Sequence, residues 1–228
     1  MIRNDGQERW RADGAKAPDR EWKGMEAQGM TITYFGYGSL VNTRTLGPQA
    51  VAEAGTLSGW RREWRAWWRP AGAENLPKVC TLTVRRAADT AIRGVMVSEP
   101  AERLAELDAR ERRYRRIDGI GPSFRRDDDG AAGAASAFLY EADSEIRRPG
   151  DDEHPILQSY VDCVLAGFHA FWGEEGVRHF IETTDGWEAP MLADRSAPRY
   201  PRAQVLDADL LALFDEQLAT TGLRYIDI

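Results

Sequence analysis

The chain has 228 residues, of which 43% are hydrophobic and 29% charged, as expected for a globular protein of one domain or one domain with an appendage. Its net charge is -7 and its pI is near 5.2, which argues against a general nucleic-acid-binding protein, because such binding needs a basic surface. No stretch approaches the ~20 apolar residues of a membrane span, and the N-terminus lacks the apolar core of a secretory signal. We therefore expect a cytoplasmic protein that binds neither nucleic acid nor membrane.

The N-terminal half predicts an extension followed by strands. Residues 1–29 carry six basic and six acidic residues with few apolar ones, which predicts a charged, flexible extension. The run TITYFGY from Thr31 predicts a strand that ends at glycine. Residues 55–69 fit a strand, but their tryptophans also fit a helical stripe, so periodicity leaves both open. The runs 79–84 and 92–97 predict two strands joined by a polar hairpin turn.

A helix is expected next, because Ser98 and Pro100 are typical of a helix start. Four residues then follow at three- and four-residue spacing, which places them on one helical face: Leu104, Leu107, Glu111 and Tyr114.

The rest of the chain changes from strands to helices. Residues 118–135 are rich in Gly, Asp and Ala and predict a loop, and residues 135–143 predict another strand. Apolar residues at strict helical spacing predict a helix over 157–172, and a last helix is expected to begin near Asp207. We therefore divide the chain into three parts: the extension 1–29, a strand-rich body at 30–143, and a helical part at 144–228 packed on the body.

Glu111 is unusual because it falls on the helical face that should be buried. A carboxylate on an apolar face is unfavourable by several kcal/mol unless it is paired or its pKa is raised. One interpretation is a helix-end glutamate paired with a neighbouring arginine. The other is a general acid/base whose pKa is raised by desolvation. Periodicity leaves both open.

The segment GYGSL at 36–40 lies where the first strand ends. Its glycines allow backbone N–H groups to approach an anion closely, although a plain tight turn is equally consistent. The segment is neither a GxSxG nucleophile motif nor a complete GxGxxG fingerprint, because Val41 takes the place of the third glycine. Ser39 as a nucleophile would need a histidine base, and no recognisable set is present.

Other candidate residues favour structural roles. The histidines lack metal-ligand spacing, so we predict no metal site; they are His154, His169 and His179. Cys80 and Cys163 lack CxxC spacing and indicate free thiols rather than a disulfide. The segment WRREWRAWWR at 60–69 mixes Trp and Arg as single-strand nucleic-acid platforms do, but such residues also pack in a sheet, and the acidic total favours packing.

Two motifs in this order resemble the γ-glutamylcyclotransferases, closest to the branch that includes the ChaC-type, glutathione-directed enzymes. They are Tyr37-Gly38-Ser39-Leu40, and Leu107-Asp108-Ala109-Arg110-Glu111 followed by Tyr114. The resemblance covers roughly residues 32–143. The segment 185–203, with Asp185-Gly186-Trp187 and Tyr200-Pro201-Arg202, matches nothing to which we assign a role.

The resemblance implies an α+β fold, a small mixed β-barrel with flanking helices, here with a helical C-terminal extension that is a candidate region for substrate selection. It implies that Glu111 is the essential carboxylate and that the backbone at Tyr37, Gly38, Ser39 and Leu40 holds a γ-glutamyl head. Tyr114 and Tyr140 match tyrosines that line the pocket. Where the family often has glycine, this chain has Arg112 and Arg113, which we expect to narrow the pocket or change its charge.

The implied activity is a cofactor-free and metal-free cyclotransferase, a lyase or acyltransferase type of enzyme. Its small-molecule substrate is a γ-glutamyl amide: glutathione, a γ-glutamyl amino acid or a γ-glutamyl amine. The α-amine attacks the γ-carbonyl and releases 5-oxoproline, with Glu111 moving the proton. Two alternatives remain open: a non-catalytic small-molecule-binding protein on the same fold, and a protein–protein adaptor that uses the Trp/Arg segment.

Overall fold

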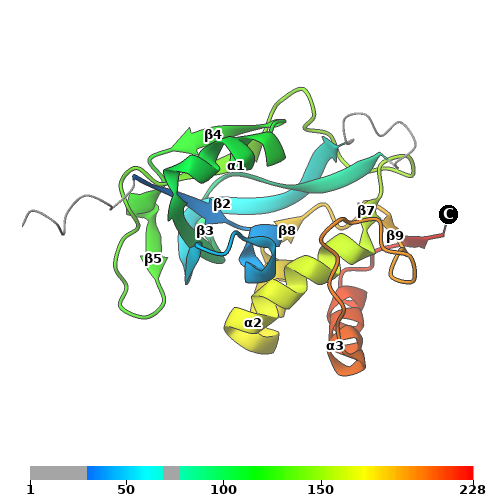
Figure 1. Cartoon of the computed structure of the whole chain (residues 1–228). Coiled ribbons are helices and arrows are strands. Elements are labelled where there is room, and N and C mark those ends of the chain that lie inside the picture. Colours follow the sequence, from blue (N-terminus) through cyan, green and yellow to red (C-terminus); the bar gives the residue numbers. More distant parts are fainter. Residues whose placement is uncertain (1–29, 69–77, 228) are drawn as a thin grey trace, which may run out of the picture.

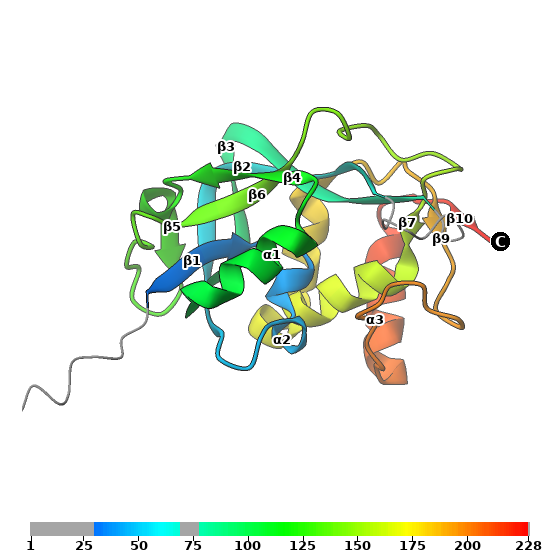
Figure 2. The same cartoon turned by 45° about the horizontal axis from the view of Figure 1, so that its top comes forward.

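The computed structural model describes residues 30–68 and 78–227, so the predicted extension 1–29 lies outside the described residues. Within these ranges the fold is α+β, as expected, with a mostly antiparallel seven-stranded sheet, a second sheet of three short strands and three α-helices. In Figures 1 and 2 the helices α2 and α3 lie together on one side of the large sheet, and α1 lies beside β1 and β4. No helix in the described ranges is long and apolar enough to cross a membrane.

The large sheet has the strand order β4-β6-β1-β3-β2-β5, with β8 paired to β2. The β1–β6 and β2–β8 pairs are parallel and the other pairs are antiparallel. Its strands are β1 (Thr31–Gly36), β2 (Val51–Trp68), β3 (Val79–Pro100), β4 (Tyr114–Asp118), β5 (Phe124–Arg126), β6 (Phe138–Ala142) and β8 (Thr184–Asp185).

The runs 79–84 and 92–97 are not two strands joined by a hairpin turn, as the sequence predicted, but parts of the single strand β3. Both parts pair with β2, and residues 87–90 between them form a bulge opposite Gly59, whose φ is +83°. Thr90 closes this bulge, because its hydroxyl donates to the carbonyl oxygen of Trp60 at 2.9 Å. A hairpin and a wide bulge have the same polar signature in sequence, and only the partner strand distinguishes them.

Residues 60–68 of the Trp/Arg segment lie in strand β2, which resolves the choice left open by its periodicity, while residue 69 lies outside the described residues. Trp60 and Trp64 are buried in the main hydrophobic core, and Arg62 between them is fully buried. The guanidinium of Arg86 lies 4.0 Å from the centre of the Trp60 ring, a cation–π contact. The buried part of this segment therefore packs inside the protein and is not a face available to nucleic acid or to a partner protein.

Helix α1 (Leu104–Arg110) follows the 3₁₀ turn Ala101–Arg103 and is shorter than predicted. Glu111 is its C-cap, and its N–H still donates to the carbonyl oxygen of Leu107 at 2.9 Å. Tyr114 does not continue the helical face, as the spacing predicted, but is the first residue of β4, where it pairs with Ala142. Pairing with β6 thus outweighs helical periodicity here.

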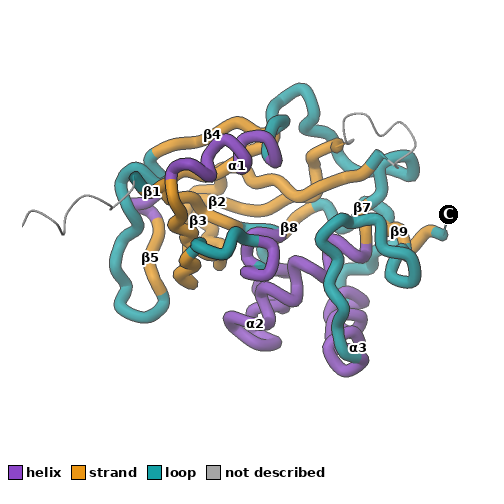
Figure 3. The backbone as a smooth tube through the Cα atoms, viewed as in Figure 1, coloured by secondary structure: helices purple, strands orange, loops and turns teal. Residues whose placement is uncertain are grey.

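The C-terminal part contains α2 (Gln158–Glu182), which is kinked at Gly173, where φ is +60°, and α3 (Ala208–Ala219). The part of α2 before the kink and α3 agree with the predicted helices. Asp207 caps α3 by accepting a hydrogen bond from the N–H of Leu210 at 2.8 Å. The second sheet was not predicted, because each of its strands has only two residues: β7 (Ile156–Leu157), β9 (Met191–Leu192) and β10 (Tyr225–Ile226). A long loop between β9 and α3 runs beside α2 (Figure 3).

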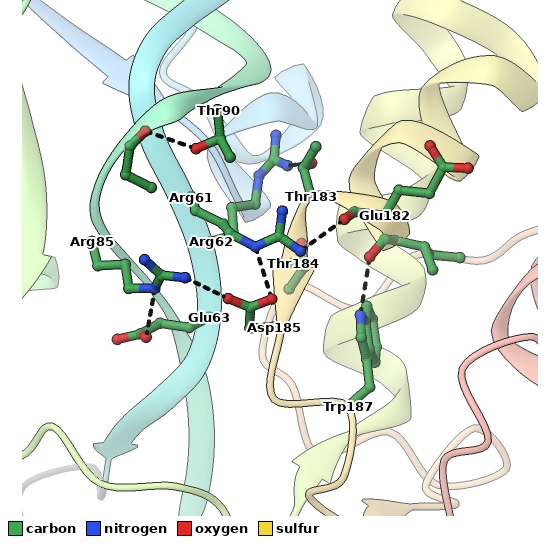
Figure 4. Close-up of polar contacts among 12 residues, drawn as sticks. Arg61, Arg62, Glu63, Arg85, Thr90, Glu182, Thr183, Thr184, Asp185 and Trp187 are labelled. Carbon is green, nitrogen blue, oxygen red and sulfur yellow. Dashed lines mark hydrogen bonds and ion pairs between the residues drawn. The ribbon is translucent and has the colours of Figure 1, made fainter.

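The segment Asp185-Gly186-Trp187 attaches the C-terminal part to the large sheet. Asp185 accepts hydrogen bonds from Arg61 at 2.8 Å and Arg85 at 2.9 Å, as Figure 4 shows. Gly186 has φ of +89° and passes so close to Trp64 that an added Cβ would lie 3.0 Å from its carbonyl oxygen. Trp187 then packs edge-on against Trp64, with ring centroids 5.4 Å apart.

His179 of α2 is a structural hydrogen-bond acceptor whose protonation is opposed by its surroundings. Its Nε2 accepts from the backbone N–H of Arg93 at 3.0 Å. Burial, and then the positive charges of Arg62 and Arg93, lower the pKa of His179 from 6.5 to about 4, while Glu175 opposes the shift. Between these two pH values the unfolded chain binds a proton that the folded chain does not, so stability falls as the pH falls.

We predict that acidification from pH ~7 to ~4.5 lowers the free energy of unfolding by about 1–2 kcal/mol through His179, after discounting for its partial exposure. Urea unfolding at several pH values measures this effect. His179→Gln keeps an acceptor for the Arg93 N–H and should flatten the dependence. His169→Gln on the same helix is the matched control and should retain it; equal slopes for the wild type and His179→Gln would contradict the prediction.

Candidate functional site

A cavity of about 170 Å³ lies where the end of β1, the end of α1 and the C-terminal part meet. An engineered cavity of about 150 Å³ holds a benzene molecule, so this one has room for a group the size of an amino-acid side chain. The structure places every site residue predicted from the sequence in its lining: Tyr37, Gly38, Ser39, Leu40, Glu111, Tyr114 and Tyr140.

The turn after β1 enters the cavity wall as a short 3₁₀ helix, Ser39–Val41. The carbonyl oxygens of Gly38 and Ser39 accept from the N–H groups of Val41 and Asn42, at 2.9 and 3.2 Å. The N–H groups of Gly38, Ser39 and Leu40 have no hydrogen-bond partner within residues 30–68 and 78–227. Consecutive N–H groups of this kind can receive an anion.

Close packing against α2 holds this turn in place. The side-chain amide of Asn42 donates to the carbonyl oxygen of Cys163 at 2.9 Å. Gly167 lets the helix approach so closely that an added Cβ would lie 2.5 Å from the backbone nitrogen of Asn42. Gly38 has little spare room either, because its Cβ would lie 3.2 Å from both Leu82 and the Tyr160 hydroxyl. The turn is therefore a fixed part of the cavity wall.

Glu111 reaches the cavity from the end of α1, and its side chain is 18% exposed. Its Oε1 lies 3.2 Å from Nε of Arg110, and Nη2 of that arginine donates to the Ser39 hydroxyl at 3.1 Å. Arg110 thus connects the carboxylate to the glycine turn. Burial raises the pKa of Glu111, while the charges of Arg110 and then Arg202 act to lower it. Desolvation outweighs both arginines, so the net direction is upward.

The three tyrosines predicted from the sequence line the cavity, and their hydroxyl groups have different roles. Tyr37 donates to the carbonyl oxygen of Tyr140 at 2.6 Å, and Tyr114 donates to that of Leu82 at 2.9 Å. Tyr140 donates to Oδ1 of Asp108 at 2.5 Å, so its hydroxyl oxygen has only lone pairs left to offer. Burial is the main cause that raises the pKa of all three hydroxyls, so they stay protonated at neutral pH.

Part of the lining was missed in the sequence, namely Tyr160 of α2 and four consecutive residues of the loop after β9: Arg199, Tyr200, Pro201 and Arg202. The segment 185–203 was assigned no role from the sequence, and nothing in Tyr200-Pro201-Arg202 indicates proximity to Glu111. Arg112 and Arg113, which we expected to alter the pocket, are exposed and absent from its lining. The cavity is instead given its positive charge by Arg110 and the two arginines of the loop.

The thiols and histidines are accounted for by packing. Cys80, which lines the cavity, and Cys163 are both buried free thiols, and burial raises the pKa of Cys80 to about 12. His154 stacks on Trp67 with ring centroids 3.5 Å apart and is hydrogen-bonded to Asp151 at 2.9 Å. Over the described ranges, no group of three or more His, Cys, Asp or Glu residues is arranged to hold a metal ion.

Asp194 fixes the loop that carries the missed residues. It is buried, and its carboxylate accepts from the backbone N–H and the hydroxyl of Ser159, at 2.8 and 2.6 Å, and from the N–H of Arg199 at 2.9 Å. The Ser159 hydroxyl also accepts from the N–H of Tyr200 at 3.2 Å. One carboxylate thus connects the start of α2 to the loop.

We predict that Asp194→Ala lowers the free energy of unfolding by at least about 1.5–3 kcal/mol, the range for one hydrogen bond to a charged group. The amides of Arg199 and Tyr200 should also exchange faster with deuterium. Arg199 loses its acceptor, and the Ser159 hydroxyl that accepts from Tyr200 loses the carboxylate that holds it. Denaturant unfolding and hydrogen exchange measure the two effects. Asp209→Ala, at an exposed position of α3, is the control. Unchanged exchange in the loop of Asp194→Ala would show that the carboxylate does not hold it.

Comparison with known proteins shows the fold. No protein-family model matches the sequence, and no curated protein matches it. A solved structure of a γ-glutamyl cyclotransferase is similar with a TM-score of 0.50 at 14% identity, covering 82% of this chain and 99% of that one. Two further solved structures are less similar. An uncharacterized human protein has a TM-score of 0.47 at 14% identity, covering 81% of this chain and 98% of that one. A yeast γ-glutamyl cyclotransferase specific to glutathione has a TM-score of 0.40 at 13% identity, covering 85% and 97%. The chain has the fold of a γ-glutamyl cyclotransferase.

Proposed function

We propose that this protein is a γ-glutamylcyclotransferase, which opens a γ-glutamyl amide by attack of its α-amine on its γ-carbonyl and releases 5-oxoproline and a free amine. The observation that carries the proposal is the position of Glu111, a carboxyl group of raised pKa in a cavity, connected through Arg110 to a glycine turn with unpartnered N–H groups.

Glu111 combines both interpretations that the sequence left open. It does pair with a neighbouring arginine, Arg110, as a structural glutamate would. Pairing alone would lower its pKa, yet burial raises it overall, and the carboxyl group borders empty space rather than packed side chains. A carboxylate that is desolvated, accessible from a cavity and raised in pKa has the properties of a general base.

The glycine turn supplies the groups that an amino-acid head needs. The unpartnered N–H groups of residues 38–40 can donate to the substrate α-carboxylate or to the oxyanion that develops on the γ-carbonyl. The oxygen of Tyr140 can accept from the α-ammonium group, because its own proton is directed to Asp108. The cavity therefore offers donors for the anionic part of the head and acceptors for its cationic part.

The reaction itself needs orientation and proton transfer. Glu111 takes one proton from the α-ammonium group, and the free amine attacks the γ-carbonyl to close a five-membered ring. The ring C–N bond forms, the amide C–N bond breaks, and Glu111 returns its proton to the departing nitrogen; the second proton of the ring nitrogen leaves to solvent. Because nucleophile and carbonyl belong to one molecule, effective molarities of ~10⁵–10⁸ M are accessible to a correctly folded substrate.

We predict that Glu111→Gln lowers kcat by about 10²–10⁴-fold, the usual effect of removing a general acid/base, while the fold is retained. The assay measures 5-oxoproline released from glutathione, a γ-glutamyl amino acid and a γ-glutamyl amine. Glu106→Gln on the same helix is the matched control, because Glu106 is exposed and, among the described residues, pairs only with Arg103. Turnover by Glu111→Gln at the parental rate would refute the mechanism. Ligand binding by the wild type without any turnover would instead favour the non-catalytic alternative.

The pH profile tests the state of Glu111 independently. The carboxylate must be ionised to act as a base, so kcat/KM should fall as the pH drops through its raised pKa. Arg110 is the largest cause that lowers this pKa, so Arg110→Gln should move the acid limb of the profile to higher pH. Arg113→Gln, an exposed position outside the cavity, should leave the limb in place. A shift to lower pH in Arg110→Gln would contradict this assignment.

A further inference from the structure

The cavity lining contains more positive than negative charge, although the protein as a whole carries a net charge of -7. Its charged members are Glu111 and three arginines, Arg110, Arg199 and Arg202. Arg110 is occupied by Glu111 and Ser39, as its distances of 3.2 and 3.1 Å show. The carboxylate of Glu111 is thus paired with Arg110, and the guanidinium groups of Arg199 and Arg202 have no further carboxylate in the cavity lining.

The arginines of the loop after β9 differ in whether their guanidinium groups are paired. Arg195 is fully used inside the protein: it donates to both carboxylate oxygens of Asp162, at 2.7 and 2.8 Å, and to Asp215 at 2.9 Å. The guanidinium groups of Arg199 and Arg202 have no ion pair or hydrogen bond to any residue in 30–68 or 78–227. The backbone of Arg199 is nevertheless fixed, because its N–H donates to buried Asp194. Within the described residues the loop thus presents two unpaired cations, and that of Arg199 stands on a fixed backbone.

An anion from the ligand is the group that such a pair recognises, and a carboxylate fits the planar guanidinium fork. The α-carboxylate of a γ-glutamyl head already has the N–H groups of the glycine turn available. A second carboxylate exists only when the departing amine is itself an amino acid or a peptide. The charge of Arg202 reaches Glu111, whereas Arg199 is not among the charges that influence it, so Arg199 acts on the ligand farther from the base than Arg202 does.

We propose that Arg199 and Arg202 are specificity-determining residues that bind a carboxylate on the departing amine, so that the enzyme selects γ-glutamyl amino acids or peptides over γ-glutamyl amines. This inference rests on the proposed function. It concerns residues in the segment after β9, outside the part of the sequence that resembles the γ-glutamylcyclotransferases.

Two peptides that differ only in that carboxylate test the proposal: γ-glutamylglycine and γ-glutamylglycinamide. Wild-type kcat/KM should favour the carboxylate form by roughly 10- to 100-fold, the range expected for hydrogen bonds between charged groups. Arg199→Gln should raise KM for γ-glutamylglycine with little change in kcat, and should leave the amide unaffected. Arg202 also lowers the pKa of Glu111, so Arg202→Gln is compared at a pH above the acid limb, where it should raise KM for γ-glutamylglycine and not for the amide. Arg178→Gln, an exposed arginine of α2 away from the cavity, should behave as the wild type.

Equal preference of the wild type for the two peptides would overturn the proposal. So would an equal loss with both peptides in the arginine variants, because that would assign the arginines to the α-carboxylate, which both peptides share. Calorimetric binding to Glu111→Gln separates the subsite from the chemistry. If no peptide is turned over, the proposed function fails, but tighter binding of γ-glutamylglycine, lost in the Arg199→Gln background, would still support the subsite. Equal or absent binding of both peptides would refute it.

Discussion

A buried guanidinium, that of Arg62, holds together the elements on which the cavity depends. Arg62 is fully buried in β2, and burial lowers its pKa to about 9, so it remains charged at neutral pH. Its Nε donates to the carbonyl oxygen of Tyr37 at 3.0 Å, Nη1 donates to the Thr183 hydroxyl at 2.6 Å, and Nη2 bonds the Arg93 carbonyl. The rings of Phe168 and Phe180 face it at 4.9 and 5.0 Å. No carboxylate pairs with Arg62 in the described ranges. Its buried charge is therefore stabilised only by oxygen acceptors and aromatic rings, which come from the residue after β1, from β3 and from α2 with its C-cap.

That constraint fixes the start of the glycine turn. The carbonyl oxygen of Tyr37 accepts a hydrogen bond from Arg62, and its hydroxyl donates one to the carbonyl oxygen of Tyr140. The position from which the chain enters the turn is therefore fixed. Asn42 fixes the other end against α2. Glu111 follows α1, and its carboxylate pairs with Nε of Arg110, whose Nη2 donates to Ser39 of the turn. A site formed by the N-terminal body is therefore completed by the C-terminal part, and the two share one hydrophobic core.

The sequence allowed prediction of the features that local patterns encode. The first strand, the α3 start at Asp207 and the motifs that contribute Gly38 and Glu111 all have short-range signatures, and the structure brings those motifs to one cavity. Tyr114 was misplaced on a helix because its spacing from Glu111 fits a helical period, whereas its real constraint is pairing with β6. Arg199 and Arg202 were not predicted at all. Their proximity to Glu111 depends on Asp194 and Ser159, which are 35 residues apart in sequence.

Within the proposed mechanism, the arginines of the cavity have opposite effects before and after substrate binds. In the free protein, the charges of Arg110 and Arg202 stabilise the ionised form of Glu111 and so make it a weaker base than burial alone would. A substrate carboxylate placed on Arg202 neutralises part of that field and also displaces water from the cavity. Both changes raise the pKa of Glu111 further, toward the value at which a base near neutral pH is most effective. Recognition of an anionic substrate and activation of the base are therefore coupled through the charge of Arg202, and a substrate with an uncharged departing amide would displace water without neutralising that charge.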